Sequence, residues 1–184
     1  MRGFILSTLI FVISGPTWAA LKLNAKSEEG HLEFMAIGRP AMIRIKGESG
    51  GPEGSIEIAA EKVTGQFKFS LNSLNTGIDM RDQHMKEKYL ETGKNPEASL
   101  MIEKMVLTDS VQGKDVPFSG QLKMHGLSKP VTGIASYETK DKNKSTHVEF
   151  KIHLSDFGIS VPSYAGVTVA DEVQIKMDLQ LKAE

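Results

Sequence analysis

Residues 173–181, with the sequence VQIKMDLQL, decide the fold class of this chain. Apolar and polar residues alternate strictly along this stretch, so every second side chain points to the same face of a β-strand. The alternation recurs in residues 148–154, VEFKIHL. One apolar face and one wet face are typical of antiparallel strands, because parallel strands are buried on both faces. We therefore predict an antiparallel all-β fold.

The rest of the chain repeats this pattern of short strands separated by turn residues. Alternating runs occur at residues 31–37, 43–46, 56–58, 63–71, 98–103, 118–124 and 131–137. The glycine-rich segment 47–54 lies between two such runs, and we interpret it as a hairpin loop. Regular spacing of strands and turns, without long helical periodicity, predicts a sandwich or a barrel.

A membrane-spanning barrel would turn its apolar face to lipid between two aromatic girdles. Aromatic residues make up only 7% of this chain, and its last four residues, LKAE, include no closing aromatic side chain. Mid-strand lysines such as Lys151 and Lys176 would each cost about 2–4 kcal/mol in contact with lipid. We therefore expect the apolar face to point inward and the chain not to span a membrane.

Residues 70–90, SLNSLNTGIDMRDQHMKEKYL, interrupt the series of strands. The strand pattern ends at Leu71, and the cluster Asn75-Thr76-Gly77 predicts a turn, since glycine adopts a positive φ at little steric cost. Residues 79–91 are polar and helix-prone. We predict one short helical insertion in an otherwise β structure.

Length and composition indicate a single globular domain. The chain has 184 residues, 40% of them hydrophobic and 24% charged, with a net charge of −1. No basic stripe with interleaved aromatic residues is present, so we expect no nucleic-acid partner. The chain contains no cysteine, which excludes disulfides, thiolate catalysis and a lipoprotein anchor.

The first 19 residues have the pattern of a signal peptide. Arg2 supplies a positive charge, residues 4–13 form a short apolar run, and Thr17-Trp18-Ala19 offers small residues for cleavage. The apolar run is well short of the roughly 20 residues needed to cross a bilayer. We expect cleavage near Ala19, with Ala20 as the alternative, and a secreted or periplasmic domain comprising residues 20–184.

No catalytic or metal-binding constellation is evident. None of the five histidines has the spacing of a zinc site, and no nucleophile elbow, Walker loop or dinucleotide fingerprint occurs. Asp82, His84 and Glu87 of the insertion form the best acid–base group, although Asp82 serves equally well as a cap or ion-pair partner. We therefore expect no enzyme activity, no metal and no cofactor.

Several motifs in order resemble those of the YceI family. They are Ser73-Leu74-Asn75-Thr76-Gly77, Arg81-Asp82-Gln83-His84-Met85, Asn95-Pro96, the segment 118–131 (FSGQLKMHGLSKPV), Ser155-Asp156-Phe157-Gly158-Ile159 and Val169-Ala170-Asp171-Glu172-Val173. The histidine often found after the family's opening strand is absent around Ile37-Gly38-Arg39. The resemblance implies a lipocalin-like antiparallel barrel that holds an isoprenoid or other lipid chain in its lumen.

A barrel of about eight strands has an interior wide enough for packed side chains or one small ligand. The expected inward-facing, ligand-binding set is Phe67, Phe69, Leu71, Leu100, Ile102, Leu122, Met124, Phe150, Ile152, Phe157, Ile175, Met177 and Leu179. Nine methionines would also suit an adaptable apolar site. Alternation alone does not distinguish a lined tunnel from a packed core, so both interpretations stay open.

Side chains of the insertion are the candidates for the barrel mouth: Arg81, Asp82, His84, Met85 and Tyr89. Arg81 has two interpretations. In the structural one it pairs with a carboxylate and pins the insertion over the barrel end; in the functional one it meets a ligand headgroup.

Three hypotheses about function follow. The first is a binding protein for an isoprenoid, quinone or other long-chain lipid, which is what the resemblance implies. The second is an interaction module with a filled barrel, and the third is an enzyme for a small envelope molecule that uses Asp82 and His84. The family resemblance also makes a homodimer possible.

Overall fold

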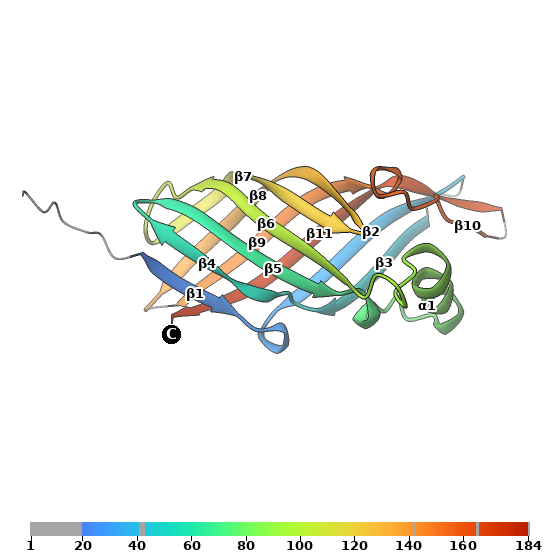
Figure 1. Ribbon diagram of the computed structural model, residues 1–184, viewed down its shortest axis with the longest axis horizontal. Helices are drawn as coiled ribbons and strands as arrows, with labels where there is room; N and C mark the ends of the chain where they lie inside the picture. Colours follow the sequence, from blue (N-terminus) through green and yellow to red (C-terminus); the bar gives the residue numbers. More distant parts are fainter. Residues whose placement is uncertain (1–19, 41–42, 142, 165, 184) are drawn as a thin grey trace, which may run out of the picture.

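The computed structural model describes residues 20–40, 43–141, 143–164 and 166–183. The expected signal peptide, residues 1–19, lies outside the described part of the chain. The described residues form a closed antiparallel β-barrel with a short helical segment at one end (Figure 1), as predicted. Within these residues we find no helix long and apolar enough to cross a membrane.

The wall of the barrel has eight strand positions, in the order β1-β4-β5-β6-β7-β8-β9-β11, and pairing of β1 with β11 closes it. The strands are β1 Leu21–Ala25, β2 His31–Arg39, β3 Ile43–Gly50, β4 Glu53–Ala59, β5 Lys62–Ser70, β6 Glu97–Val106, β7 Gln112–Met124, β8 Leu127–Lys140, β9 Asn143–His153, β10 Ser163–Tyr164 and β11 Val167–Ala183. The helical turns are η1 Ser27–Glu29, η2 Leu71–Ser73, α1 Asp79–His84, η3 Met85–Tyr89 (a π-helix) and η4 Leu154–Phe157.

Strands β2 and β3 lengthen the wall at one end. β2 pairs with β11 and β3, whereas β1 pairs with the last residues of β11 and with β4. β1 and β2 thus share one position in the wall, and β3 and β4 share the next. The long strand β11 pairs first with β2 and then, at its last residues, with β1.

The predicted hairpin loop at residues 47–54 is wrong. β3 continues into β4 with only Gly51-Pro52 between them, and each pairs with a neighbouring strand. The glycines are needed for close packing: a Cβ on Gly47 would lie 2.3 Å from the ring of Phe34, and one on Gly51 would lie 2.6 Å from Gly30 Cα. The glycines of this stretch therefore mark places where neighbouring strands pack closely, and they do not mark a turn.

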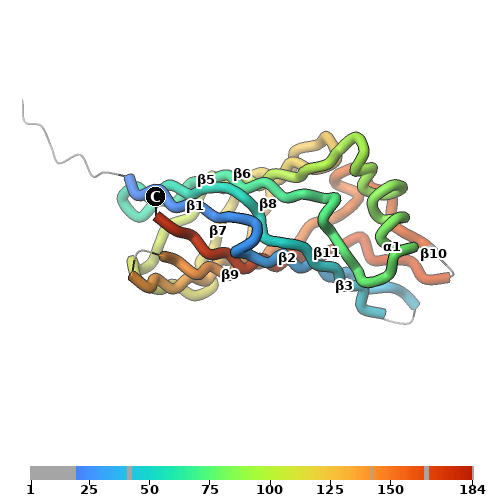
Figure 2. Tube along the Cα trace, turned by 90° about the horizontal axis from the view of Figure 1, so that it is seen from below, coloured from blue at the N-terminus to red at the C-terminus, as the bar shows by residue number. Residues whose placement is uncertain are grey.

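The helical insertion fills the wall beyond the end of β5. Asn75 and Glu48 of β3 form a two-way backbone bridge, with N–O distances of 2.8 and 2.9 Å. α1 and η3 follow this bridge, and Leu90 returns the chain to the core. Figures 1 and 2 show the insertion and β10 at the same end of the barrel, opposite the C-terminus. We call this end the mouth.

Strand alternation places one continuous apolar core inside the barrel, as predicted. On β11, Val173, Met177, Leu179 and Leu181 are buried, and the residues between them face outward or are partly exposed. Ile175 is the exception, because it lies on the inner face yet keeps accessible surface. An inward side chain with accessible surface indicates an internal cavity at that level.

Candidate ligand-binding site

The interior of the barrel is open at the mouth and holds a cavity of about 480 Å³. Strands β2, β3, β5, β6, β7, β9 and β11 contribute its wall, and the insertion and the chain around β10 contribute its entrance. The volume lies within the range of about 300–1,000 Å³ typical of small-molecule sites. The lining is almost entirely apolar: Arg81 and His84 supply the titratable nitrogens, and hydroxyl groups come from Ser49, Ser70, Thr76, Tyr89 and Ser163.

The other half of the barrel is filled. A cavity of about 50 Å³ lies there, enough for only a few water molecules. Phe150 lines the mouth cavity and Phe118 lines the small one, and their rings meet edge to face at 6.3 Å and 83°. This aromatic pair lies at the level where the open half of the lumen ends.

The predicted lumen residues divide between these two halves. Those that line the mouth cavity are Phe69, Leu71, Leu122, Met124, Phe150, Ile152 and Ile175. Those that line the small cavity of the filled half are Phe67, Leu100, Ile102, Met177 and Leu179. Both interpretations of the lumen therefore apply: it is an open cavity in the half near the mouth and a packed core in the other half.

Phe157 lines neither of these two cavities, contrary to the expectation. β9 ends at His153, and η4 follows, so the strand alternation that runs to residue 154 does not extend to Phe157. Its side chain is only 1% exposed, and its carbonyl oxygen lies 3.0 Å from Nδ1 of His125 in the β7–β8 turn. The Phe157 side chain thus packs in the hydrophobic core, and its carbonyl group links η4 to the β7–β8 turn.

Thr76 joins the two charged residues of the insertion. Arg81 donates from Nε to Thr76 Oγ1 at 2.8 Å and from Nη2 to the Thr76 carbonyl at 2.7 Å. The Thr76 hydroxyl and backbone N–H both donate to Asp82 Oδ1, the latter at 2.8 Å. This network holds the turn at Thr76 against the first turn of α1 and fixes the direction of the Arg81 side chain.

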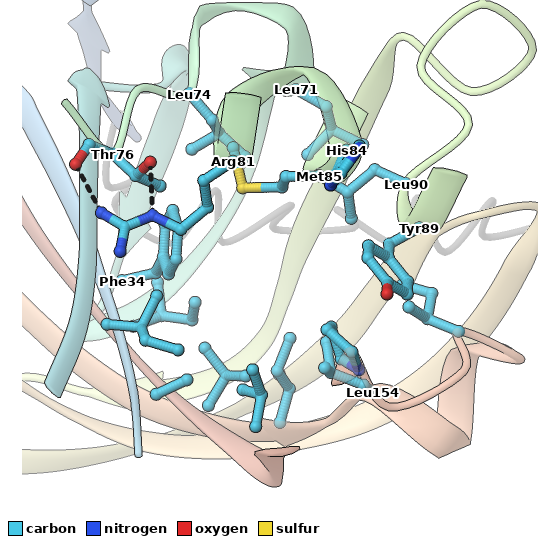
Figure 3. A pocket seen from close by; sticks show the side chains of 18 of the residues that line it. Phe34, Leu71, Leu74, Thr76, Arg81, His84, Met85, Tyr89, Leu90 and Leu154 are labelled. Atoms are coloured by element: carbon cyan, nitrogen blue, oxygen red, sulfur yellow. Dashed lines mark hydrogen bonds between the residues drawn. The ribbon is translucent and has the colours of Figure 1, made fainter. Parts of the chain in front are cut away.

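Arg81 therefore has both a structural and a ligand-facing aspect. Its structural partner is Thr76 and not the expected carboxylate, because Asp82 reaches the same threonine from the other side. Figure 3 shows the two bonded guanidinium nitrogens turned to Thr76 and the third nitrogen turned toward Phe34 and the interior. Among the described residues that line the cavity, Arg81 is the only arginine or lysine.

The other predicted mouth residues lie on both sides of the insertion. His84, Met85 and Tyr89 line the cavity, where Figure 3 shows them with Leu90 above Leu154. Asp82 does not line it. Glu87 accepts hydrogen bonds from Gln83, and Asp82 accepts them from Thr76. The two carboxylates of the acid–base hypothesis therefore have different partners. Among the described residues, no group of three or more His, Asp or Glu side chains is placed so that it could hold a metal ion.

Two of the titratable groups with shifted pKa values, His147 and Glu149, lie on the outer wall. Hydrogen bonds to the carboxylate of Asp178, and then to that of Glu149, raise the pKa of His147, at distances of 2.7 and 2.9 Å. The same contact, with Lys176, lowers the pKa of Glu149. These side chains bridge the exposed faces of β9 and β11 and have no part in the cavity.

Sequence reasoning missed more than half of the cavity lining. The missed residues are Leu32, Phe34, Ala36, Ile43, Ile45, Ser49, Ser70, Leu74, Thr76, Ile78, Met80, Leu90, Ala98, Leu154, Ile159, Pro162, Ser163, Val167, Val169 and Val173. Alternation in residues 31–37 could have identified the β2 members. No local signal marks the later lining residues, which reach the cavity only because the chain folds back across the mouth: Ile159, Pro162, Ser163, Val167 and Val169.

Comparisons with known proteins agree with this architecture. A curated UPF0312 protein of Enterobacter sp. (strain 638) is 25% identical over 172 residues, covering 87% of this chain and 86% of that protein. Among solved structures, BcnA of Burkholderia cenocepacia superposes with a TM-score of 0.72 at 17% identity, over 85% of this chain and 98% of that one.

Two further structures share the fold. A polyisoprenoid-binding domain from Saccharophagus degradans, implicated in plant cell wall breakdown, has a TM-score of 0.67 at 18% identity and covers 89% of this chain and 99% of its own. The Campylobacter jejuni YceI protein has a TM-score of 0.56 at 17% identity, with 100% and 99% covered. Residues 25–181 match the YceI-like domain, and the chain belongs to the YceI-like family.

Proposed function

We propose that this protein is a lipid-binding protein that encloses an isoprenoid, quinone tail or other long hydrocarbon chain in the mouth cavity. The observation that carries the proposal is the 480 Å³ cavity, apolar along its wall and open at one end. A filled barrel would leave no such space, and an enzyme would need reactive groups converging inside it.

Burial of hydrocarbon would supply the affinity. Each methylene group transferred from water into the cavity contributes about 0.8 kcal/mol. A long apolar chain therefore binds with few polar contacts, which fits a lining of mostly aliphatic and aromatic side chains. The floor at Phe118 and Phe150 limits the depth that the chain reaches.

A polar head would remain at the mouth. The third guanidinium nitrogen of Arg81 faces the interior beside Phe34, where a carbonyl, hydroxyl or phosphate oxygen would accept its hydrogen bond. Because Thr76 holds the other two nitrogens, the donor is already oriented before a ligand arrives.

Family membership and one structural neighbour support this proposal. The neighbour from Saccharophagus degradans is described as a polyisoprenoid-binding domain, and the family and its neighbours favour binding over catalysis. The signal-peptide pattern of residues 1–19 supports action in the periplasm or outside the cell.

Native mass spectrometry of the protein from its own host tests the proposal. We expect an additional apolar mass that organic solvent extracts, and uptake of a polyprenol or quinone by the stripped protein. Ala98→Phe adds a ring to the cavity wall and should abolish uptake, whereas Ser99→Phe adds the same ring to the outer face of β6 and should not. A clean apo mass that stays unchanged with every tested lipid would refute lipid binding.

A further inference from the structure

Apolar side chains are exposed around the cavity entrance. Ile43 begins β3, Ile78 and Met80 lie at the start of α1, and Val161 precedes β10; they are 45%, 53%, 59% and 36% exposed. We call these four residues the mouth rim. Ile43, Ile78 and Met80 also line the cavity, so apolar surface runs without a break from the lumen to the outside.

Single exposed apolar residues are common on protein surfaces, and the far end of this barrel also has some, such as Val111. The mouth rim differs because its members come from three separate segments and border one opening. The segment 158–168, GISVPSYAGVT, adds a stretch of eleven residues without a charge. A clustered apolar rim of this kind indicates an interaction surface.

Basic residues flank the mouth rim. Segments 39–44 and 77–91 contain five basic residues, Arg39, Arg44, Arg81, Lys86 and Lys88, and four acidic ones, Asp79, Asp82, Glu87 and Glu91, the last of which pairs with Lys94. The whole chain, by contrast, has a net charge of −1. Asp82 is engaged by Thr76, and Arg39, Arg44 and Lys86 form no ion pair within the part of the chain that the structure describes.

We propose that the mouth rim docks on the surface of an anionic lipid bilayer. Apolar side chains with flanking cations are the combination that enters the boundary between headgroups and acyl chains. Docking would place the cavity entrance directly over the hydrocarbon. If the cavity holds a lipid, as proposed above, the chain then passes between bilayer and lumen without crossing water.

Vesicle flotation tests the docking with the protein purified from its host, after its intact mass has shown whether residues 1–19 are retained. We expect the protein to float with vesicles of phosphatidylglycerol mixed with phosphatidylcholine, and far less with phosphatidylcholine alone. Raising the salt to about 0.5 M should weaken binding, because screening removes the electrostatic part. Gel filtration of the same sample records the oligomeric state.

The double variant Ile78→Ser/Met80→Ser should lower the vesicle partition coefficient at least about tenfold, since it removes two apolar side chains from the interface. Val111→Ser is the matched control, because Val111 is 56% exposed but lies in the loop between β6 and β7 at the opposite end, and it should leave binding unchanged. Arg44→Gln/Lys86→Gln should reduce the preference for anionic vesicles.

Three results would overturn the docking proposal. They are absence of flotation with anionic vesicles, flotation that the Ile78→Ser/Met80→Ser variant leaves intact, and conversion of a dimer to a monomer by that variant without vesicle binding. The last result would assign the mouth rim to a second copy of the chain. Polyprenol uptake from detergent, measured on the same samples, separates the two proposals: uptake without flotation refutes docking alone, and flotation without uptake refutes the carrier function alone.

Discussion

Two leucine-to-alanine substitutions, one in each half of the lumen, test whether the mouth half is open in solution. Leu100 on β6 has no exposed surface and belongs to the filled half, whereas Leu32 on β2 is 6% exposed and lines the mouth cavity. Both substitutions remove the same atoms from inward-facing strand positions. Their costs differ only through what surrounds each side chain.

The expected magnitudes follow from the two cavities. Buried Leu→Ala substitutions cost about 2.7–5.0 kcal/mol, rising by about 24 cal/mol per Å³ of new cavity. Leu100 adjoins a cavity of only 50 Å³, so its substitution should cost about 4–5 kcal/mol. Leu32 already borders 480 Å³ of empty space and loses fewer contacts, so we expect about 2–3 kcal/mol.

Urea unfolding followed by circular dichroism measures both costs, with linear extrapolation and a check that the slopes stay equal. With lipid bound, the difference between the two costs should shrink. The ligand stabilises the native state by mass action, and Leu32→Ala also removes contacts to that ligand. Equal costs in the lipid-free protein, or a larger cost at Leu32, would mean that the mouth half collapses in solution. The proposed lipid site would then lose its main support.

Two further substitutions probe the mouth and the outer wall. Arg81→Ala removes two hydrogen bonds to Thr76 and should lower the local stability of the insertion by about 1–2 kcal/mol. Amide hydrogen exchange in residues 71–90 should then become faster. Unchanged exchange together with weakened lipid binding would show that Arg81 serves the ligand only. His147→Gln should lower the unfolding free energy at about pH 5.5 but hardly at about pH 8.5. The pKa of His147 is raised by Asp178 and Glu149, so its stabilisation is complete below the unfolded pKa of about 6.5 and is lost as pH rises through the folded value. Because the side chain is 40% exposed, screening keeps this effect below about 1 kcal/mol, and an equal loss at both pH values in urea titrations would contradict the linkage.

Strand alternation determined the fold class directly from the sequence. In residues 148–154 and 173–181 the side-chain period of two is a property of the extended backbone, so it needs no knowledge of partners. The insertion was equally visible, since Asn75-Thr76-Gly77 breaks the strand period and a helix-prone segment follows. The ordered motifs then indicated the family to which the chain belongs.

Glycines show where local reasoning failed. Residues 47–54 have the composition of a turn, but Gly47 is glycine because the ring of Phe34 occupies the place of its Cβ. That requirement comes from a residue on another strand. The prediction that Phe157 lines the lumen was wrong for a related reason, because a 3₁₀ turn after His153 ends the strand alternation.

Whether the lumen is open or filled was decided only by the tertiary structure. Phe67 and Phe69 occupy equivalent inward positions two residues apart on β5, yet one lines the filled half and the other lines the mouth cavity. The sequence determines which side chains point inward, because that depends on the backbone period alone. The empty volume depends on how side chains from opposite walls meet across the closed barrel, as Phe118 and Phe150 do, and those distances arise only when the barrel closes.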